Sequence, residues 1–362
     1  MINDITLGNT GRKISADTNF VETHITKADW YQMTAVYGQA NLGKSLWQLL
    51  NTFIPYCLLW ALMVHTIRLK YPYWATLVLA VPAAGILVRI FILFHDSCHG
   101  SFFASRRANT ILGYVTGILT FTAFEDWRHA HNRHHATAGD LDRRGVGDIW
   151  TMTIEEYLVA PLRKRLAYRI YRNPFILLGP GSILLFLFLQ RFPTKGARKK
   201  ERRSVLYTNL GLLLVVGAAA WTIGLPAYFL IQLPIIVIAG GLGLWLFYIQ
   251  HQFENAYWVR RESWDPVRVA LEGSSYFKLP KILQWFTGNI GLHHIHHVRP
   301  GIPNYNLQQC YDEVPALQAI KATTLRTSFR SLKIGLYDEK KKKLVSFRSL
   351  RLLTKTDELT VS

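Results

Sequence analysis

Two long apolar runs near the start of the chain constrain its fold more than any other feature. Residues 46–67 contain no Asp, Glu, Lys or Arg and a single histidine, His65, and residues 73–94 contain a single charge, Arg89. Each run has the ~20 residues that an α-helix needs to cross a hydrocarbon core about 30 Å thick. Because a short connection joins them, they predict an antiparallel pair of transmembrane helices, with Arg89 near enough to a helix end to reach the membrane surface.

The longest apolar stretch, residues 205–250, has room for two more spans. Gly224-Leu225-Pro226 interrupts it and divides it into 205–224 and 226–250. The sequence therefore predicts an all-α, polytopic membrane protein with four transmembrane helices and a helical cap on the cytoplasmic side.

Two shorter apolar stretches are not expected to cross the membrane. Residues 174–190 have strongly basic segments on both sides and contain Gly179-Pro180-Gly181. Since the Lys and Arg of short loops collect on the cytoplasmic side, this stretch should enter and leave on one face. Residues 108–124 are short and contain several polar and glycine residues, which favours a position along the interface. We expect both stretches to be re-entrant or interfacial.

The charge of the chain supports the same topology. It has 42 Lys and Arg against 23 Asp and Glu, a formal net charge of +19. No nucleic-acid recognition module accompanies this charge, so we interpret it as the positive cytoplasmic face of a membrane protein without a nucleic-acid partner. We expect a cytoplasmic N-terminal segment at 1–45, with no signal-peptide pattern, a membrane domain at 46–310 and a basic cytoplasmic segment at 311–362.

Histidines are the second strong feature of the sequence. Eleven of the 13 fall in four places, each predicted to lie just beyond the cytoplasmic end of an apolar segment. At spacings of i, i+3 and i+4, side chains share one face of a helix. The histidines with this spacing, together with one at the end of the fourth predicted span, are the candidate metal ligands: His95, His99, His131, His134, His135, His251, His293, His296 and His297.

A bound metal explains this gathering, because clustered imidazoles would repel one another on protonation unless a cation held them neutral. Nine ligands are too many for one ion and suit two. Imidazole alone suits zinc, copper, iron or nickel, but a two-metal site beside apolar spans suits a lipid substrate and O2, which favours two non-haem iron ions. The three cysteines lie far apart without a CxxC pair, so neither a thiolate zinc site nor a disulfide framework is expected.

Other polar residues near these histidines are expected to support the site. We expect His129 and His294 to be structural or to contact the ligands. Asn289, one turn before the last cluster, is a candidate for binding a water molecule at the metal. Four carboxylates are candidate acceptors for ring N–H groups, namely Asp96, Glu125, Asp126 and Glu254.

Three segments, HDSCHGSFF, WRHAHNRHH and HHIHHVRPGIPNYNL, resemble in order and spacing the three histidine boxes of the integral-membrane fatty acid desaturases. The resemblance covers roughly residues 45–310. The spacing within the first box is similar to the acyl-lipid, Δ12/ω-6-like branch rather than to the acyl-CoA Δ9 branch.

The resemblance implies a di-iron centre on the nine candidate ligands, with His251 as the additional family histidine. It implies that the centre uses O2 as co-substrate and two electrons to place a cis double bond in an acyl chain. The implied substrate is an acyl-lipid or acyl-thioester, in contact with membrane lipids.

The resemblance also implies a separate electron donor of the ferredoxin or cytochrome b5 type. The chain has no His-Pro-Gly-Gly haem motif and no Gly-rich flavin or nicotinamide fingerprint. Such donors are acidic, so Arg198, Lys199 and Lys200 on the basic face are candidates for steering them.

Two other functions remain open from the sequence. Membrane hydroxylases and carotenoid ketolases carry the same boxes and differ in the outcome after the first hydrogen is removed. A histidine-rich metal transporter would place polar residues within its spans, whereas the histidines here lie at the span ends.

Overall fold

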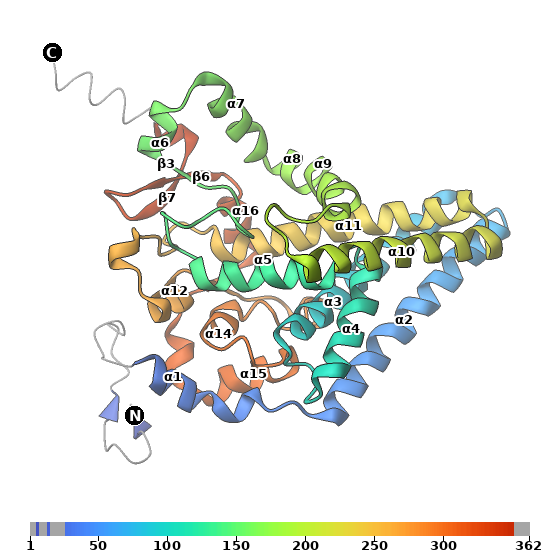
Figure 1. Cartoon of the computed structure of the whole chain (residues 1–362), viewed down its shortest axis with the longest axis horizontal. Coiled ribbons are helices and arrows are strands. Elements are labelled where there is room, and N and C mark those ends of the chain that lie inside the picture. Colours follow the sequence, from blue (N-terminus) through green and yellow to red (C-terminus); the bar gives the residue numbers. More distant parts are fainter. Residues whose placement is uncertain (1–4, 7–12, 15–25, 351–362) are drawn as a thin grey trace.

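The computed structural model describes residues 5–6, 13–14 and 26–350, which form a mostly helical fold (Figure 1). The all-α expectation is thus confirmed, while the predicted terminal segments 1–45 and 311–362 lie partly outside the described residues. Four long helices extend together from a broad cap: α2 (Leu42–Arg68), α3 (Tyr73–His99), α10 (Lys199–Thr222) and α11 (Leu225–His251). α2, α3 and α11 contain the predicted spans 46–67, 73–94 and 226–250, and α10 contains residues 205–222 of the predicted span 205–224.

Local signals set the ends of these helices. At the start of α2, the Lys44 backbone N–H donates to Asn41 Oδ1 at 2.9 Å, which satisfies a donor that the helix itself leaves open. α3 continues past residue 94 and ends at Gly100, whose φ of 70° is the left-handed conformation that glycine adopts readily. This continuation carries His95 and His99, and α11 likewise ends on His251.

α3 is the interior helix of the bundle. It packs against α2, α11 and α4 (Arg106–Leu119). In its most apolar segment 61% of the residues are buried, compared with 17% in α2. The outer faces of α2 and α10 instead expose bulky apolar side chains such as Leu58 and Leu214, which suits contact with lipid.

Arg89 does not reach the membrane surface, so that expectation is wrong. Its side chain is buried, and the guanidinium donates to Thr52 Oγ1 at 2.9 Å, Asn51 Oδ1 at 3.2 Å and the Trp285 carbonyl. It also lies over the Trp285 ring, 4.5 Å from the centroid. Because α2 offers polar acceptors inside the bundle, the side chain finds its partners there rather than in water.

Residues 174–191 form a broken helical segment that packs against α11. Its parts are α8 (Pro174–Leu178), α9 (Pro180–Ile183), a π-helical turn at Leu184–Phe188 and a 3₁₀ turn at Leu189–Arg191. By length and composition this is a fifth segment of the described chain that is able to cross a membrane, besides the four long helices. Its re-entrant or interfacial path stays a prediction.

The stretch predicted at 108–124 divides into two elements. α4 ends at Leu119, Phe121 turns the chain with a φ of 58°, and α5 (Phe124–Thr137) begins. α4 packs against α3 and α10, while α5 runs into the cap with the second histidine box.

The cap contains the remaining helices and three small sheets. The helices are α1 (Lys27–Met33), α6 (Ile154–Val159), α7 (Leu162–Tyr171), α12 (Pro266–Glu272), α13 (Lys281–Phe286), α14 (His293–Val298), α15 (Asn304–Glu313) and α16 (Leu325–Ser331), with 3₁₀ turns at Ala35–Gly38, Arg261–Ser263 and Pro315–Ala319. The strands are β1 (Ile5–Thr6), β2 (Lys13–Ile14), β3 (Met152–Thr153), β4 (Tyr276–Phe277), β5 (Ala322–Thr323), β6 (Ile334–Asp338) and β7 (Lys343–Ser346).

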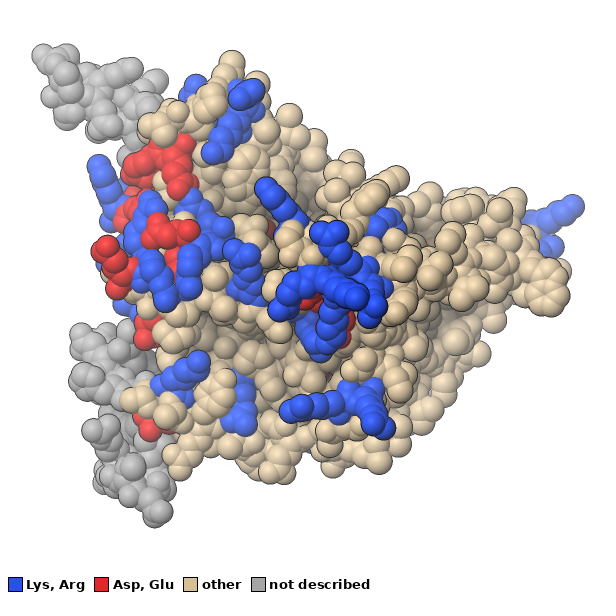
Figure 2. All heavy atoms as spheres, in the orientation of Figure 1, with Lys and Arg blue, Asp and Glu red and all other residues tan. Residues whose placement is uncertain are grey.

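The sheets are short and do not change the fold class. β1 pairs antiparallel with β2, β4 pairs parallel with β5, and β6 pairs parallel with β3 and antiparallel with β7. The β3–β6–β7 sheet shares a small apolar core with α6 and α7. Figure 2 shows that charged side chains on this face gather over the cap and the start of α10, while the long helices are almost free of them.

Candidate metal centre

All nine histidines predicted as ligands come together at the cap end of the long helices. They form two groups, and within each group one ring nitrogen per residue lies within 4.8 Å of the others. The first group is His95, His99, His131, His135 and His296, and the second is His134, His251, His293 and His297. The groups adjoin, because the His135 and His297 rings stack with their centroids 4.2 Å apart. Each of the last two histidine boxes contributes to both groups.

The hydrogen bonds of the second group show which nitrogens face its centre. His251 Nδ1 lies 3.1 Å from the Gly273 carbonyl, which only accepts, so Nδ1 carries the hydrogen. In a neutral ring, Nε2 then carries a lone pair. That Nε2 lies 3.0 Å from Nε2 of both His134 and His293. His134 Nδ1 faces Asp148 Oδ1 at 2.5 Å, so the Nε2 of His134 also carries a lone pair. Two lone pairs at this distance repel unless a cation lies between them, so the group fits a metal ion.

The first group has the same character. His135 Nε2 lies 3.1 Å from His131 Nε2 and 3.0 Å from His296 Nε2. Nε2 of His95 and of His99 is buried without a hydrogen-bond partner among the described residues. Since buried polar atoms are nearly always satisfied, these orphaned nitrogens also fit a metal.

The protonation of these rings favours ligation. Burial lowers the pKa of His131, His135 and His296 well below the ordinary value for histidine, and the neighbouring histidines lower it further. The same causes lower the pKa of His293 and His297. Neutral imidazole is the form that binds metals, so at neutral pH these side chains are ready to do so.

Two carboxylates orient rings of the groups. Asp96 Oδ1 lies 3.2 Å from His95 Nδ1, and Asp96 Oδ2 accepts from the Asn304 backbone N–H at 2.7 Å. Asp148 Oδ1 lies 2.5 Å from His134 Nδ1. Each contact directs Nε2 of the same histidine toward the centre of that histidine's group. Asp96 was expected from the sequence, whereas Asp148 was missed because it follows α5 in an irregular loop at no regular spacing from a histidine.

The other three candidate carboxylates do not contact the grouped histidines, so that expectation is wrong for them. Glu125 pairs with Arg128 and with Lys200 Nζ at 3.0 Å. Asp126 accepts from Thr194 Oγ1 at 2.9 Å, and exposed Glu254 pairs with Lys343 at 3.3 Å. The helical turn at the start of α5 directs both of its acids toward α10 and the segment before it rather than toward the rings.

Three further residues named from the sequence lie outside both groups. His294 is buried and donates from Nε2 to the Leu317 carbonyl at 3.2 Å, a structural contact. His129 is exposed, with Nδ1 3.4 Å from Arg198 Nη2. Asn289 turns the chain before α14 with a φ of 57°, and its role toward a water molecule stays a prediction.

Aromatic side chains cover the five-histidine group on the side of the long helices. Trp127 stacks on His131 with centroids 4.2 Å apart. The rings of Phe91 and Phe94 of α3 pack against the Trp127 ring, with centroids 5.4 and 5.1 Å from its centroid. This apolar wall keeps water from one side of the group and suits a hydrocarbon chain.

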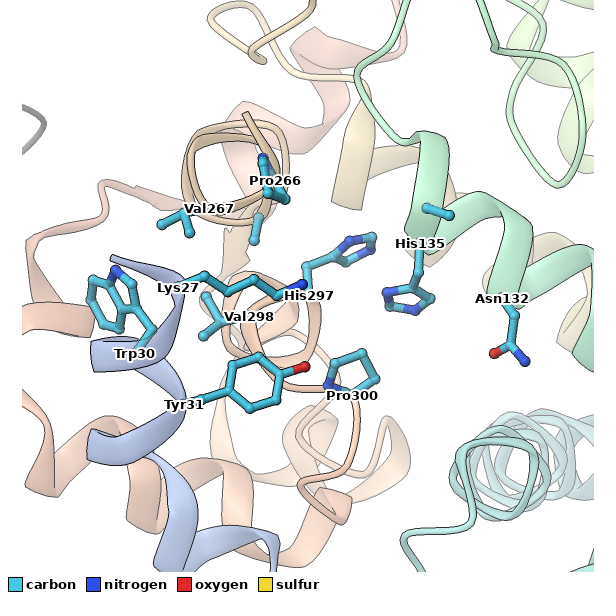
Figure 3. A pocket seen from close by; sticks show the side chains of 12 residues that line it. Lys27, Trp30, Tyr31, Asn132, His135, Pro266, Val267, His297, Val298 and Pro300 are labelled. Atoms are coloured by element: carbon cyan, nitrogen blue, oxygen red, sulfur yellow. The ribbon is translucent and has the colours of Figure 1, made fainter. Parts of the chain in front are cut away.

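A cavity of about 260 Å³ reaches both groups between α1, α5, α12 and α14 (Figure 3). His135 and His297, one from each group, line it. Lys27 and Tyr31 of α1 lie across from these rings. Both groups are therefore accessible from the cap.

Comparison with known proteins identifies the family. The profile of the fatty acid desaturase family matches residues 72–328, more than half of the chain. The chain belongs to the fatty acid desaturase family. Because it belongs to this family, the chain is an integral-membrane oxidoreductase. The alternative function of a histidine-rich metal transporter is therefore excluded.

Individual desaturases are similar over much of their length. A fatty acid desaturase of Bacillus subtilis is 48% identical over 320 residues, covering 88% of this chain and 90% of its own. An sn-1 oleoyl-lipid 12-desaturase of Picosynechococcus is 26% identical, covering 63% of this chain and 65% of its own. A chloroplastic omega-6 fatty acid desaturase of Arabidopsis thaliana is 22% identical, covering 67% of this chain and 54% of its own. The resemblance to Δ12 and ω-6 desaturases is thus distant.

Proposed function

We propose that this desaturase holds two non-haem iron ions on the nine grouped histidines and introduces a cis double bond into an acyl chain. The observation that carries the proposal is the pair of adjacent, all-histidine groups whose ring nitrogens converge. Imidazole ligands suit iron, and bound iron would supply one-electron and O2 chemistry. The five-histidine group and the four-histidine group would each hold one ion.

The reaction sets requirements that the described residues meet. One O2, two electrons and two protons, with two hydrogens from adjacent methylenes, yield a double bond and two waters. The four helices α3, α5, α11 and α14 fix the histidines in place, and the Trp127 wall offers an apolar surface beside the first group. We infer that the acyl chain approaches along this wall from the bilayer, as an acyl-lipid or acyl-thioester. Positioning one carbon pair there favours reaction at a single site.

Expression in a host that lacks the product tests this function together with the metal. The wild-type chain should yield a fatty acid with one more double bond than its precursor and contain two irons per chain, by elemental analysis and by Mössbauer spectroscopy of ⁵⁷Fe-grown protein. His134→Ala should abolish the product and lower the iron content, because it removes a nitrogen at the centre of the second group. His129→Ala, which changes an exposed histidine outside both groups, is the matched control.

Two outcomes would contradict the proposal. A hydroxylated acyl chain in place of the alkene would show hydroxylation, since the two products differ in mass. Full product and iron content in His134→Ala would refute the assignment of the second group.

The electron donor is proposed to be a separate acidic protein that docks on the basic surface where α5 meets the start of α10 (Figure 2). Arg198 and Lys200 there pair with the buried acids Glu201 and Glu125. Lys199 and Arg203 are exposed and form no ion pair with a described residue. Because α5 carries three of the grouped histidines, a donor at this surface would lie close to the metal centre.

A further inference from the structure

α7 exposes an apolar stripe that no other part of the described chain covers. Leu162, Leu166 and Ile170 are 64%, 51% and 56% exposed. They recur every four residues, so they share one face of the helix. Tyr168 on the opposite face is fully buried in the core shared with the β3–β6–β7 sheet. The helix is therefore anchored along one side and presents hydrocarbon along the other.

The charges of α7 are all positive. Its sequence LRKRLAYRIY contains no acid, and Figure 2 shows basic side chains over it. At 3.6 residues per turn, Arg163 and Arg169 lie about 60° to either side of the centre of the stripe, while Lys164 lies on the far side of the helix. Arg169 Nε donates to Tyr157 Oη at 2.6 Å and its guanidinium lies over the Phe347 ring, whereas Arg163 is exposed. An apolar stripe with flanking cations is the pattern of helices that lie in a membrane interface, with the cations at the headgroups.

The stripe continues into a segment of membrane composition. Asn173 follows α7 and caps α8, accepting from the Phe175 backbone N–H at 2.9 Å. Phe175 is 87% exposed and is the second residue of the segment 174–191, which is apolar enough to enter a bilayer. One end of α7 is thus joined directly to a segment that is apolar enough to enter a bilayer.

We propose that α7 lies in the membrane–water interface, with its apolar stripe among phospholipid acyl chains and Arg163 at anionic headgroups. A second copy of this chain is a poorer occupant, because it would bring the same cations against each other. An anionic lipid surface instead attracts nearby Lys and Arg side chains.

This position would link the bilayer to the metal centre. Arg172, the residue after α7, is buried and donates to Gln252 Oε1 at 2.9 Å and Tyr248 Oη at 2.8 Å. Both partners flank His251 at the end of α11. Lipid contact at α7 would therefore hold the ligand-bearing end of α11 at a fixed depth.

Fluorescence depth measurements on the full chain test the proposal without relying on activity. Single cysteines at Leu166→Cys and Lys164→Cys, in a Cys57→Ser background that removes the exposed native thiol, are labelled with an environment-sensitive fluorophore. The proteins are reconstituted in phosphatidylcholine vesicles with and without phosphatidylglycerol. Quenching by brominated lipid is compared with quenching by iodide, and Arg163→Gln is added to the Leu166→Cys protein.

The probe at 166 should emit at shorter wavelength than the probe at 164, and brominated lipid should quench it several-fold more. Iodide should instead quench the probe at 164. Phosphatidylglycerol should increase lipid quenching at 166, and Arg163→Gln should remove that increase. Equal access of iodide to both positions would overturn the proposal. So would a probe at 166 shielded from both quenchers, which would show a protein contact, or an absence of response to phosphatidylglycerol.

Discussion

At the scale of single residues, the direction of hydrogen bonds decides which ring nitrogens are available to a metal. Asp148 and the Gly273 carbonyl occupy Nδ1 of His134 and His251 and so leave both Nε2 atoms facing one point. Such partners of ligands typically change metal affinity 10- to 100-fold when they are replaced.

Asp148→Asn should weaken metal binding at the four-histidine group by about 10- to 100-fold, because a neutral amide holds the His134 tautomer less firmly. The measurement is the iron that remains after titration with a soluble chelator. Asp126→Asn is the control: it is a buried acid of α5 whose pKa burial raises, and it contacts Thr194 rather than a grouped histidine. Equal iron retention in the two variants would show that Asp148 does not orient His134.

At the scale of elements, the site depends on how closely α4 approaches α5. A Cβ added at Gly113 of α4 would lie 2.1 Å from Phe124 Cε2. Phe124 is fully buried and packs edge to face against Phe94. Its ring has no room to move, so this contact requires glycine.

Gly113→Ala should lower the unfolding temperature in detergent. Alanine favours a helix by about 1 kcal/mol over glycine, but overpacking a filled core costs about 1–3 kcal/mol, and the second effect should prevail at this rigid contact. Gly217→Ala on α10, where an added Cβ meets nothing within 4 Å, should leave the unfolding temperature unchanged or raise it. A Gly113→Ala protein as stable as the parent would contradict the proposed close packing.

At the scale of the whole molecule, charge and hydropathy divide the protein into a membrane part and a cap. The proposed orientation places the cap in the cytoplasm and the α2–α3 connection outside. In a Cys57→Ser background, Tyr71→Cys should react with an impermeant maleimide in intact cells, whereas Lys340→Cys should react only after permeabilisation. Reversed labelling would invert the orientation.

The same labelling tests the path of residues 174–191. Lys164→Cys and Lys195→Cys lie on either side of it, and both should be protected in intact cells if the segment enters and leaves on one face. Labelling of only one of them from outside would show that the segment is a fifth span.

The surface proposed for donor docking acts through its net charge. Replacing Lys199 and Arg203 with Gln should reduce the rate with an acidic redox protein several-fold at low salt and leave the rate with a chemical reductant unchanged. The difference should shrink near 0.1 M salt, where the Debye length falls to about 10 Å. Lys340→Gln with Lys342→Gln, an equal change of charge on exposed residues of the β6–β7 turn, is the control. Equal rates in both double variants would exclude docking at this surface.

The sequence alone determined the four long helices and the nine grouped histidines, because the length of an apolar run and the spacing of side chains on a helix are local properties. The tertiary structure decided how the nine divide into groups of five and four, since each box lies on a helix whose rotation is set by its packing partners. It also decided that Arg89 turns inward, that Asp148 rather than Glu254 meets a histidine, and that α7 leaves an apolar face uncovered. These features depend on segments far apart in the chain, and only folding brings those segments into contact.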